Sequence, residues 1–202
     1  MYTESMAEAR AKATEKTRRR VLAAARAAFA TQGYAGATIR SIAADAGLTT
    51  MGIYTYAPSK AALFQLVYED GIQRIYREFA EVVAGQGSLI EEVHAVLDRG
   101  GELLQRDPDL LHFTIRVAMD HQHDDLRQLN LLTEPYLEFY RRLADRAVAR
   151  KELPRREADR LVNFVTLLLW GITTAAALDP DNVEEAVKTA KWAADGRLAP
   201  GR

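Results

Sequence analysis

The stretch Thr38–Tyr56, TIRSIAADAGLTTMGIYTY, decides the fold of the N-terminal part of this chain. It predicts two short helices joined by a tight turn. Thr38 and Thr49 can each cap one helix, because a threonine oxygen accepts hydrogen bonds from the free N–H groups of a first turn. Gly47 suits the left-handed conformation that ends a helix. Two short helices joined by a three- or four-residue turn that contains glycine are typical of a helix-turn-helix.

Apolar residues in this stretch recur at the spacing of one helical face, i, i+3, i+4 and i+7. Four of the apolar residues are assigned to the core rather than to a contact surface: Ile42, Ala43, Leu48 and Ile53. The second helix should end near Ala57, because a residue that precedes proline is disfavoured in helical geometry.

The second helix has a surface suited to duplex DNA. It carries hydroxyls, a thioether, a glycine and two tyrosines, and no acidic residue. Such groups suit phosphate oxygens and base edges in a major groove. Gly52 costs about 1 kcal/mol in a helix interior relative to alanine, and close approach to DNA or to the first helix would explain it. On spacing alone, an ordinary helical hairpin within a core remains the alternative.

Length and composition allow one large or two small domains in 202 residues, with an apolar fraction of 48% that suffices for a buried core. Cysteine is absent, which excludes a disulfide framework and thiolate chemistry. The N-terminus has no secretory segment. These features fit a cytoplasmic protein.

The formal net charge of −1 hides an asymmetry. Residues 1–60 contain nine lysines and arginines against four acids, and the rest of the chain carries the compensating negative charge. A basic N-terminal third on an acidic body indicates that only this third faces a polyanion, although uneven charge on a solvated surface is common.

Helical periodicity continues along the chain and no segment alternates as a strand would, so the predicted fold class is all-α. Residues 1–14 are polar and alanine-rich and are interpreted as a frayed arm. A first firm helix is expected over 15–32, ended by Gly33. Further helices are expected over 60–83, from Ser88 after a GQGS break, over 108–121, over 124–152 with a kink near Pro135, and over 161–178 and 182–194.

The segment 18–67, RRRVLAAARAAFATQGYAGATIRSIAADAGLTTMGIYTYAPSKAALFQLV, resembles the N-terminal DNA-binding domain of TetR-family transcriptional regulators. The match runs without a gap and includes AAFATQGY, SIAADAG, GIYTY and PSKAAL. The resemblance implies a three-helix helix-turn-helix domain over 1–60, with its arm at 1–14. It also implies a helical effector-binding and dimerisation domain over 61–202.

The resemblance also implies which positions contact DNA: Thr38, Arg40, Thr49, Thr50, Met51, Gly52, Tyr54, Tyr56 and Lys60. Their chemistry agrees, because arginine can bond guanine in bidentate fashion and methionine can touch a thymine methyl. One position departs from the family pattern. The family usually has phenylalanine where this chain has Ala57, which puts the local packing in doubt.

Residues 161–178 form an uncharged run slightly short of the ~20 residues that a membrane span needs. A helix that is apolar on most faces is otherwise buried on both sides. The resemblance favours burial, with one face on the body and the other on a partner subunit in a four-helix interface. The expected interface residues are Val162, Val165, Thr166, Leu169, Thr173, Val187 and Lys191. A two-fold dimer should read a near-palindromic operator, and no membrane association is expected.

The resemblance further implies a small-molecule site between the helices of the second domain. Its candidate residues are His94, His112, Phe113, Tyr136, Tyr140, Asn163 and Trp170. Any one of them is more often a core or surface residue than a ligand contact. A metal site is not expected, because His121 and His123 are two apart and cannot share a helical face. No cofactor is expected.

Two classes of function remain open. The first is a dimeric regulator, most simply a repressor that a small-molecule ligand releases from its operator by a shift in population. Activation is the alternative within this class. The second is a helical small-molecule-binding protein or enzyme with no role on DNA. No nucleophile–base spacing, phosphate loop or metal motif supports catalysis.

Overall fold

The computed structural model describes residues 2–83, 85, 87–120, 126 and 134–198, and within this part of the chain every regular element is helical. The all-α prediction is therefore confirmed. The chain divides into two compact units. We call Met1–Asp70 with His112–Asn130 the headpiece, and Gly71–Leu111 with Leu131–Arg202 the body.

The headpiece contains α1 (Tyr2–Gly36), α2 (Ile39–Asp45), α3 (Thr50–Tyr54) and parts of two helices that continue into the body, α4 (Lys60–Val82) and α6 (Pro108–Asp120). The predicted break at Gly33 is confirmed: its φ of 69° interrupts α1, and one further turn follows. The frayed arm was a wrong interpretation, since the helix begins at Tyr2. Alanine, glutamate, lysine and arginine are strong helix formers, and they dominate this segment.

An aromatic cluster forms the core of the headpiece. The Phe29 ring lies 5.0 Å from that of Phe64, and Phe64 lies 5.5 Å from Tyr34 and 5.3 Å from Phe113, centroid to centroid. Phe113 belongs to α6, so a helix far along the sequence completes this core. Phe113, a predicted effector contact, is fully buried in this core.

The body contains the C-terminal part of α4 with α5 (Leu89–Arg106), α7 (Glu134–Ala149), α8 (Ala158–Leu178) and α9 (Val183–Leu198), and two short 3-10 turns, Arg155–Glu157 and Pro180–Asn182. Ser88 begins α5 with a capping box, in which its side chain and that of Glu91 satisfy each other's backbone N–H groups. Pro135 lies in the first turn of α7. A kink at Pro135 in a helix over 124–152 therefore stays a prediction. Most of the predicted segment 124–133 lies outside the described residues.

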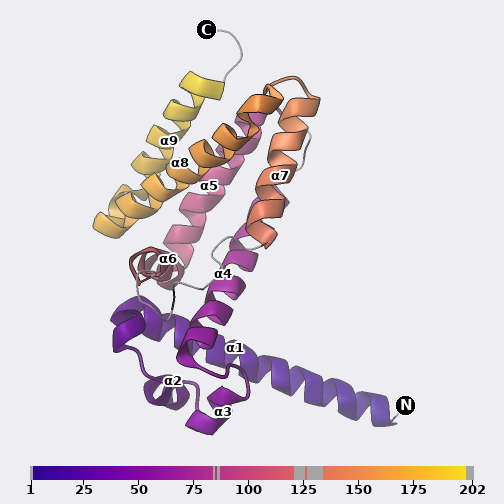
Figure 1. Ribbon diagram of the computed structural model, residues 1–202, viewed down its shortest axis with the longest axis vertical. Coiled ribbons are helices and arrows are strands. Elements are labelled where there is room, and N and C mark those ends of the chain that lie inside the picture. The colour runs from indigo at the N-terminus through magenta and orange to yellow at the C-terminus, as the bar shows by residue number, and fades with distance from the viewer. Residues whose placement is uncertain (1, 84, 86, 121–125, 127–133, 199–202) are drawn as a thin grey trace. The chain divides into compact units, whose positions relative to one another are not determined.

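The helices α5, α8 and α9 pack side by side (Figure 1). Two adjacent glycines of α5 allow this close approach. A Cβ at Gly100 would lie 2.9 Å from Leu169 Cδ2, and one at Gly101 would lie 2.6 Å from Val187 Cγ2. The Gly100–Gly101 pair thus forms the contact surface of α5 with α8 and α9.

We therefore expect Gly101→Ala to lower the free energy of unfolding by about 1–2 kcal/mol, because overpacking a stiff β-branched neighbour outweighs the gain in helix propensity. Urea denaturation measures this change. Gly196→Ala in α9 is the matched control, since a Cβ there meets nothing within 4 Å. It should stabilise the protein by about 0.5–1 kcal/mol, and equal effects of the two variants would contradict the packing argument.

Candidate functional site

Two threonines cap the short helices of the headpiece. Thr38 Oγ1 accepts a hydrogen bond from the Ser41 N–H at 3.1 Å, and Thr49 Oγ1 accepts one from the Gly52 N–H at 3.1 Å. Both threonines have extended backbone conformations, as N-caps require. The two helix starts predicted from the sequence are therefore confirmed.

The turn between α2 and α3 is held at both of its ends. Gly47 has a φ of 64°, and the Leu48 N–H donates to the Ala43 carbonyl at 2.8 Å. The Arg20 guanidinium of α1 donates to the Ala46 carbonyl at the end of α2. A cation at a helix C-terminus is favoured by the helix dipole. The sequence reasoning missed Arg20, which gave no local signal beyond its place in a run of three arginines.

The exposed residues of α2 and α3 are mostly polar, and Met51 is the large apolar exception. Ile53 is fully buried, whereas Met51 is 72% exposed and Tyr54 is 46% exposed. Arg40 and Thr50 are also exposed, and Tyr56 and Gly52 are half-buried. The exposed residues of α2 and α3 thus include hydroxyls, a thioether, a phenol and a guanidinium. Ala57, the departure from the family pattern, is buried in the headpiece.

Lys60 points into the headpiece. Its ammonium donates to the Tyr34 carbonyl at 2.8 Å and to the Ala37 carbonyl at 3.3 Å, and it lies 4.3 Å from the centroid of the Tyr34 ring. These contacts occupy two of its three protons. Its third N–H group is therefore the one that could donate to a DNA phosphate, as predicted.

The kink of α1 at Gly33 is also held by a polar contact from α6. Asp120 accepts a hydrogen bond from the Tyr34 N–H at 2.6 Å, directly after the left-handed Gly33. The last residue of α6 therefore fixes the backbone at the end of α1. Because the two residues are far apart in the sequence, no local pattern pointed to this bond.

Comparison with known proteins agrees with this geometry. Residues 21–67 match the family described as bacterial regulatory proteins, tetR family. This N-terminal segment is similar to the DNA-binding domain of the TetR family. No curated protein matches the sequence.

Several solved structures share the fold of this chain. A regulator from Pseudomonas aeruginosa PAO1 has a TM-score of 0.76 at 20% identity, covering 93% of this chain and 92% of that chain. A TetR regulator from Chloroflexus aurantiacus J-10-FL has a TM-score of 0.72 at 25% identity, covering 93% and 98%. FadR from Bacillus subtilis, in complex with stearoyl-CoA, has a TM-score of 0.75 at 16% identity, covering 91% and 99%.

The residues predicted to bind an effector do not gather in one place. His94 pairs with Asp195 of α9, with 3.0 Å between Nε2 and Oδ1. His112 is exposed and belongs to the headpiece, and Asn163 and Trp170 are exposed on α8. The structure brings together only Tyr136 and Tyr140, whose rings lie 4.9 Å apart.

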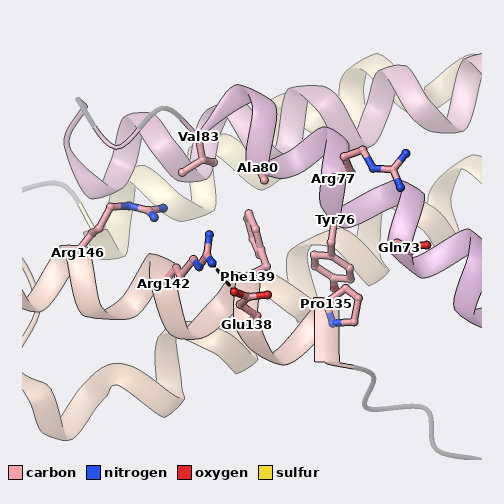
Figure 2. A pocket seen from close by; sticks show the side chains of 10 residues that line it. All are labelled: Gln73, Tyr76, Arg77, Ala80, Val83, Pro135, Glu138, Phe139, Arg142 and Arg146. Atoms are coloured by element: carbon pink, nitrogen blue, oxygen red, sulfur yellow. Dashed lines mark hydrogen bonds and ion pairs between the residues drawn. The ribbon is translucent and has the colours of Figure 1, made fainter.

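These two tyrosines lie behind a groove between α4 and α7. Tyr76 contacts both, with centroid distances of 5.5 Å to Tyr136 and 5.8 Å to Tyr140. The groove has a volume of about 310 Å³. Figure 2 shows its lining: Gln73, Tyr76, Arg77, Ala80, Val83, Pro135, Glu138, Phe139, Arg142 and Arg146. The sequence reasoning named none of these residues as an effector contact, although 138, 142 and 146 are spaced to share one face of α7.

A buried carboxylate orders one end of the groove. Glu92 of α5 is only 3% exposed, and it accepts hydrogen bonds from Arg146 at 3.2 Å and from Arg150 at 3.2 Å. Glu152 accepts from Arg150 and from the Leu89 N–H, both at 2.9 Å. Burial lowers the pKa of Arg150, but its bonds to Glu152 and Glu92 outweigh burial and raise that pKa overall.

The predicted interface residues divide between the interior and the surface. Val165 and Val187, which were predicted at a dimer interface, are buried inside the body by the chain itself. Thr166 and Leu169 face inward as well, toward the Tyr136 hydroxyl at 3.4 Å and toward Gly100. Lys191 pairs with Asp98 at 2.8 Å, and Val162 and Thr173 are half-buried. The uncharged sequence of α8 does not by itself indicate which of its faces the rest of the chain covers.

A different stripe of α8 is apolar and uncovered. Leu167 is 69% exposed, Trp170 and Leu178 are also exposed, and Trp192 of α9 is 77% exposed. Within the described residues, Arg155–Leu178 is long and apolar enough to cross a membrane by length and composition. The core helix of a soluble protein passes the same test, and α8 packs on α5, α7 and α9.

Burial raises the pKa of the Tyr140 phenol from 10.0 to about 12. Between these values the unfolded chain has released the proton that the folded chain retains, so stability falls as the pH rises. We expect the free energy of unfolding to drop by up to about 2–3 kcal/mol across this window through Tyr140 alone.

Urea denaturation of the wild type and of Tyr140→Phe at pH 9 and pH 11 measures this effect. The difference between the two proteins should change in favour of the variant as the pH rises. A difference that is the same at both pH values would show that the Tyr140 phenol is not protected by burial.

Proposed function

We propose that this chain is a dimeric, sequence-specific DNA-binding transcriptional regulator, a repressor that a small-molecule effector releases from a near-palindromic operator. The observation that carries the proposal is the outer face of α3. Five residues of helix, capped by Thr49 and anchored by buried Ile53, expose Thr50, Met51 and Tyr54 without any carboxylate. Such a face matches the phosphates, base edges and thymine methyls of a major groove.

The charge of the first 60 residues supports the same partner. This segment is strongly basic while the rest of the chain is acidic. Arg40 forms no ion pair in the described part of the chain, so its guanidinium is available for a phosphate or a guanine edge. The Thr49 hydroxyl accepts from a backbone N–H group and keeps a proton to donate to a phosphate. The Thr38 hydroxyl donates to Ser41 Oγ at 3.0 Å and would have to exchange that bond for one to a phosphate.

Selection of bound sequences from random duplex DNA tests this proposal. The wild type should enrich a near-palindromic site, whose half-sites lie about 34–36 Å or a multiple of that apart along the duplex. Tyr54→Ala and Arg40→Ala should each weaken binding to that site by about tenfold or more, the loss expected for one good base or phosphate contact. Arg156→Ala, an exposed arginine of the body, gives the same change in net charge and should leave binding unchanged.

Two outcomes would contradict the proposal. One is the absence of any enriched duplex at low salt. The other is an equal loss of duplex binding in Arg40→Ala and Arg156→Ala, which would show that the protein binds DNA only through nonspecific electrostatic attraction. Either result would favour the alternative, a helical small-molecule-binding protein or enzyme with no role on DNA. Activation instead of repression is the alternative within the same class, and a reporter gene placed behind the selected site distinguishes the two.

The uncovered stripe of α8 supports dimerisation. Leu167, Trp170 and Leu178 form an exposed apolar stripe on α8, and Trp192 of the adjoining helix α9 is exposed as well. Large exposed apolar patches mark interaction sites in soluble proteins. A second copy with the same stripe would bury it in a two-fold interface. The apolar run that could have been a membrane span thus serves the dimer in this proposal, as expected of a cytoplasmic regulator.

We expect Leu167→Arg to shift the protein toward monomer, with a dissociation constant at least about tenfold higher, because an unpaired charge would have to be buried. Sedimentation velocity across a dilution series measures this shift. Leu137→Arg on α7 is the control, since Leu137 is also exposed but lies off this stripe. A wild type that stays monomeric at micromolar concentration would contradict dimerisation.

A small-molecule effector is supported by the groove in the body. One structural neighbour, FadR from Bacillus subtilis, was solved in complex with stearoyl-CoA, so this fold can bind a small molecule. In our proposal the effector favours a conformation whose two copies of α3 no longer match the spacing of the half-sites. Only a difference in affinity for the two conformations can produce that response.

A further inference from the structure

The groove between α4 and α7 combines an apolar floor with a basic rim. Its floor is apolar and aromatic, formed by Tyr76 and Phe139 with Ala80, Val83 and Pro135. Its rim is basic, with three arginines against the single carboxylate of Glu138. Figure 2 shows Arg142 and Arg146 together at one end of the groove and Arg77 with Gln73 at the other.

The three arginines differ in how they are held. Arg77 forms no ion pair in the described part of the chain. Arg142 pairs with Glu138 one turn away on α7, at an exposed edge where such a pair contributes little. Arg146 is anchored by the buried Glu92, which fixes its guanidinium before any ligand arrives. The rim therefore keeps an excess of positive charge beside an apolar floor.

An anion is the natural complement of this rim. A guanidinium fork matches carboxylate, sulfonate or phosphate oxygens in bidentate fashion. Arg142 and Arg146 are four residues apart on α7 and so lie on one face, where one anionic group can meet both. The apolar floor next to them suits the hydrophobic part of the same molecule. A groove of this volume lies at the small end of the range for small-molecule sites.

We propose that this groove binds a small anionic amphiphile. Its acidic group lies on Arg142 and Arg146, and its apolar body lies over Phe139 and Ala80 toward Tyr76. Arg77 adds to the positive field from the far end. This inference rests on the proposed function in one respect only: it names the chemical class of the effector.

Two fluorescent probes with the same aromatic body test the proposal directly. They are 8-anilinonaphthalene-1-sulfonate, which is anionic, and N-phenyl-1-naphthylamine, which lacks the sulfonate. Both are titrated into the full-length protein in the absence of DNA. The anionic probe should bind at least tenfold more tightly than the neutral one. Equal affinities, or no binding of the anionic probe, would overturn the proposal.

Matched variants on α7 locate the acidic group. Arg142→Gln should weaken the anionic probe at least tenfold and the neutral probe less than twofold. Arg141→Gln is the control, because this neighbouring arginine does not line the groove and has only a 3.8 Å contact with Glu134. Equal losses in the two variants would overturn the assignment of the acidic group to Arg142.

A third variant locates the apolar body. Ala80 lies at the exposed side of α4, so Ala80→Trp should fill the groove without disturbing the core. It should weaken both probes at least tenfold, while its helical circular dichroism matches the wild type. A fluorescence signal that survives Ala80→Trp would come from another surface and would overturn the proposal.

Failure of this inference is separable from failure of the proposed function. The titrations contain no DNA, and duplex binding by Ala80→Trp is measured separately. A variant that still selects the wild-type site but binds probe as the wild type does would overturn the groove and leave the regulator intact. A wild type that binds the probe but no duplex would overturn the proposed regulator and leave the groove inference intact.

Discussion

The five-residue helix α3 has no stability of its own, and the account of this protein depends on what holds it in place. Isolated helices of this length do not form in water, because nucleation costs more than one turn of hydrogen bonds returns. Here Thr49 supplies the missing cap, and Ile53 anchors the helix in the interior. With the inner side fixed by Ile53, Met51 and Tyr54 are left on the outside, where they can meet a partner.

The support for α3 reaches well beyond the helix-turn-helix stretch. Arg20 closes α2, Lys60 bonds the backbone on either side of the turn after Gly33, and Asp120 bonds the Tyr34 N–H. Because α6 is one continuous helix that ends in this cluster, a change in α6 alters the packing of Phe113 and the bond at Tyr34.

Local chemistry explains which features could be predicted from the sequence. The caps at Thr38 and Thr49, the turn at Gly47 and the break at Gly33 each depend on a few adjacent residues, and all four were predicted. The roles of Asp120 and Arg146 depend on partners 86 and 54 residues away, which no local pattern reports. The burial of Val165 was not predicted for the same reason, since composition cannot show which stripe of α8 the chain itself covers.

The most direct test of the central claim is an NMR titration of the ¹³C-labelled methionine methyl groups with the selected duplex. The chain has four methionines, so the spectrum is simple to assign. The account predicts that the Met51 methyl signal shifts or broadens most, because Met51 is the exposed thioether of α3. A duplex that binds tightly while the Met51 signal stays unchanged would show that another surface contacts DNA, and would contradict the account.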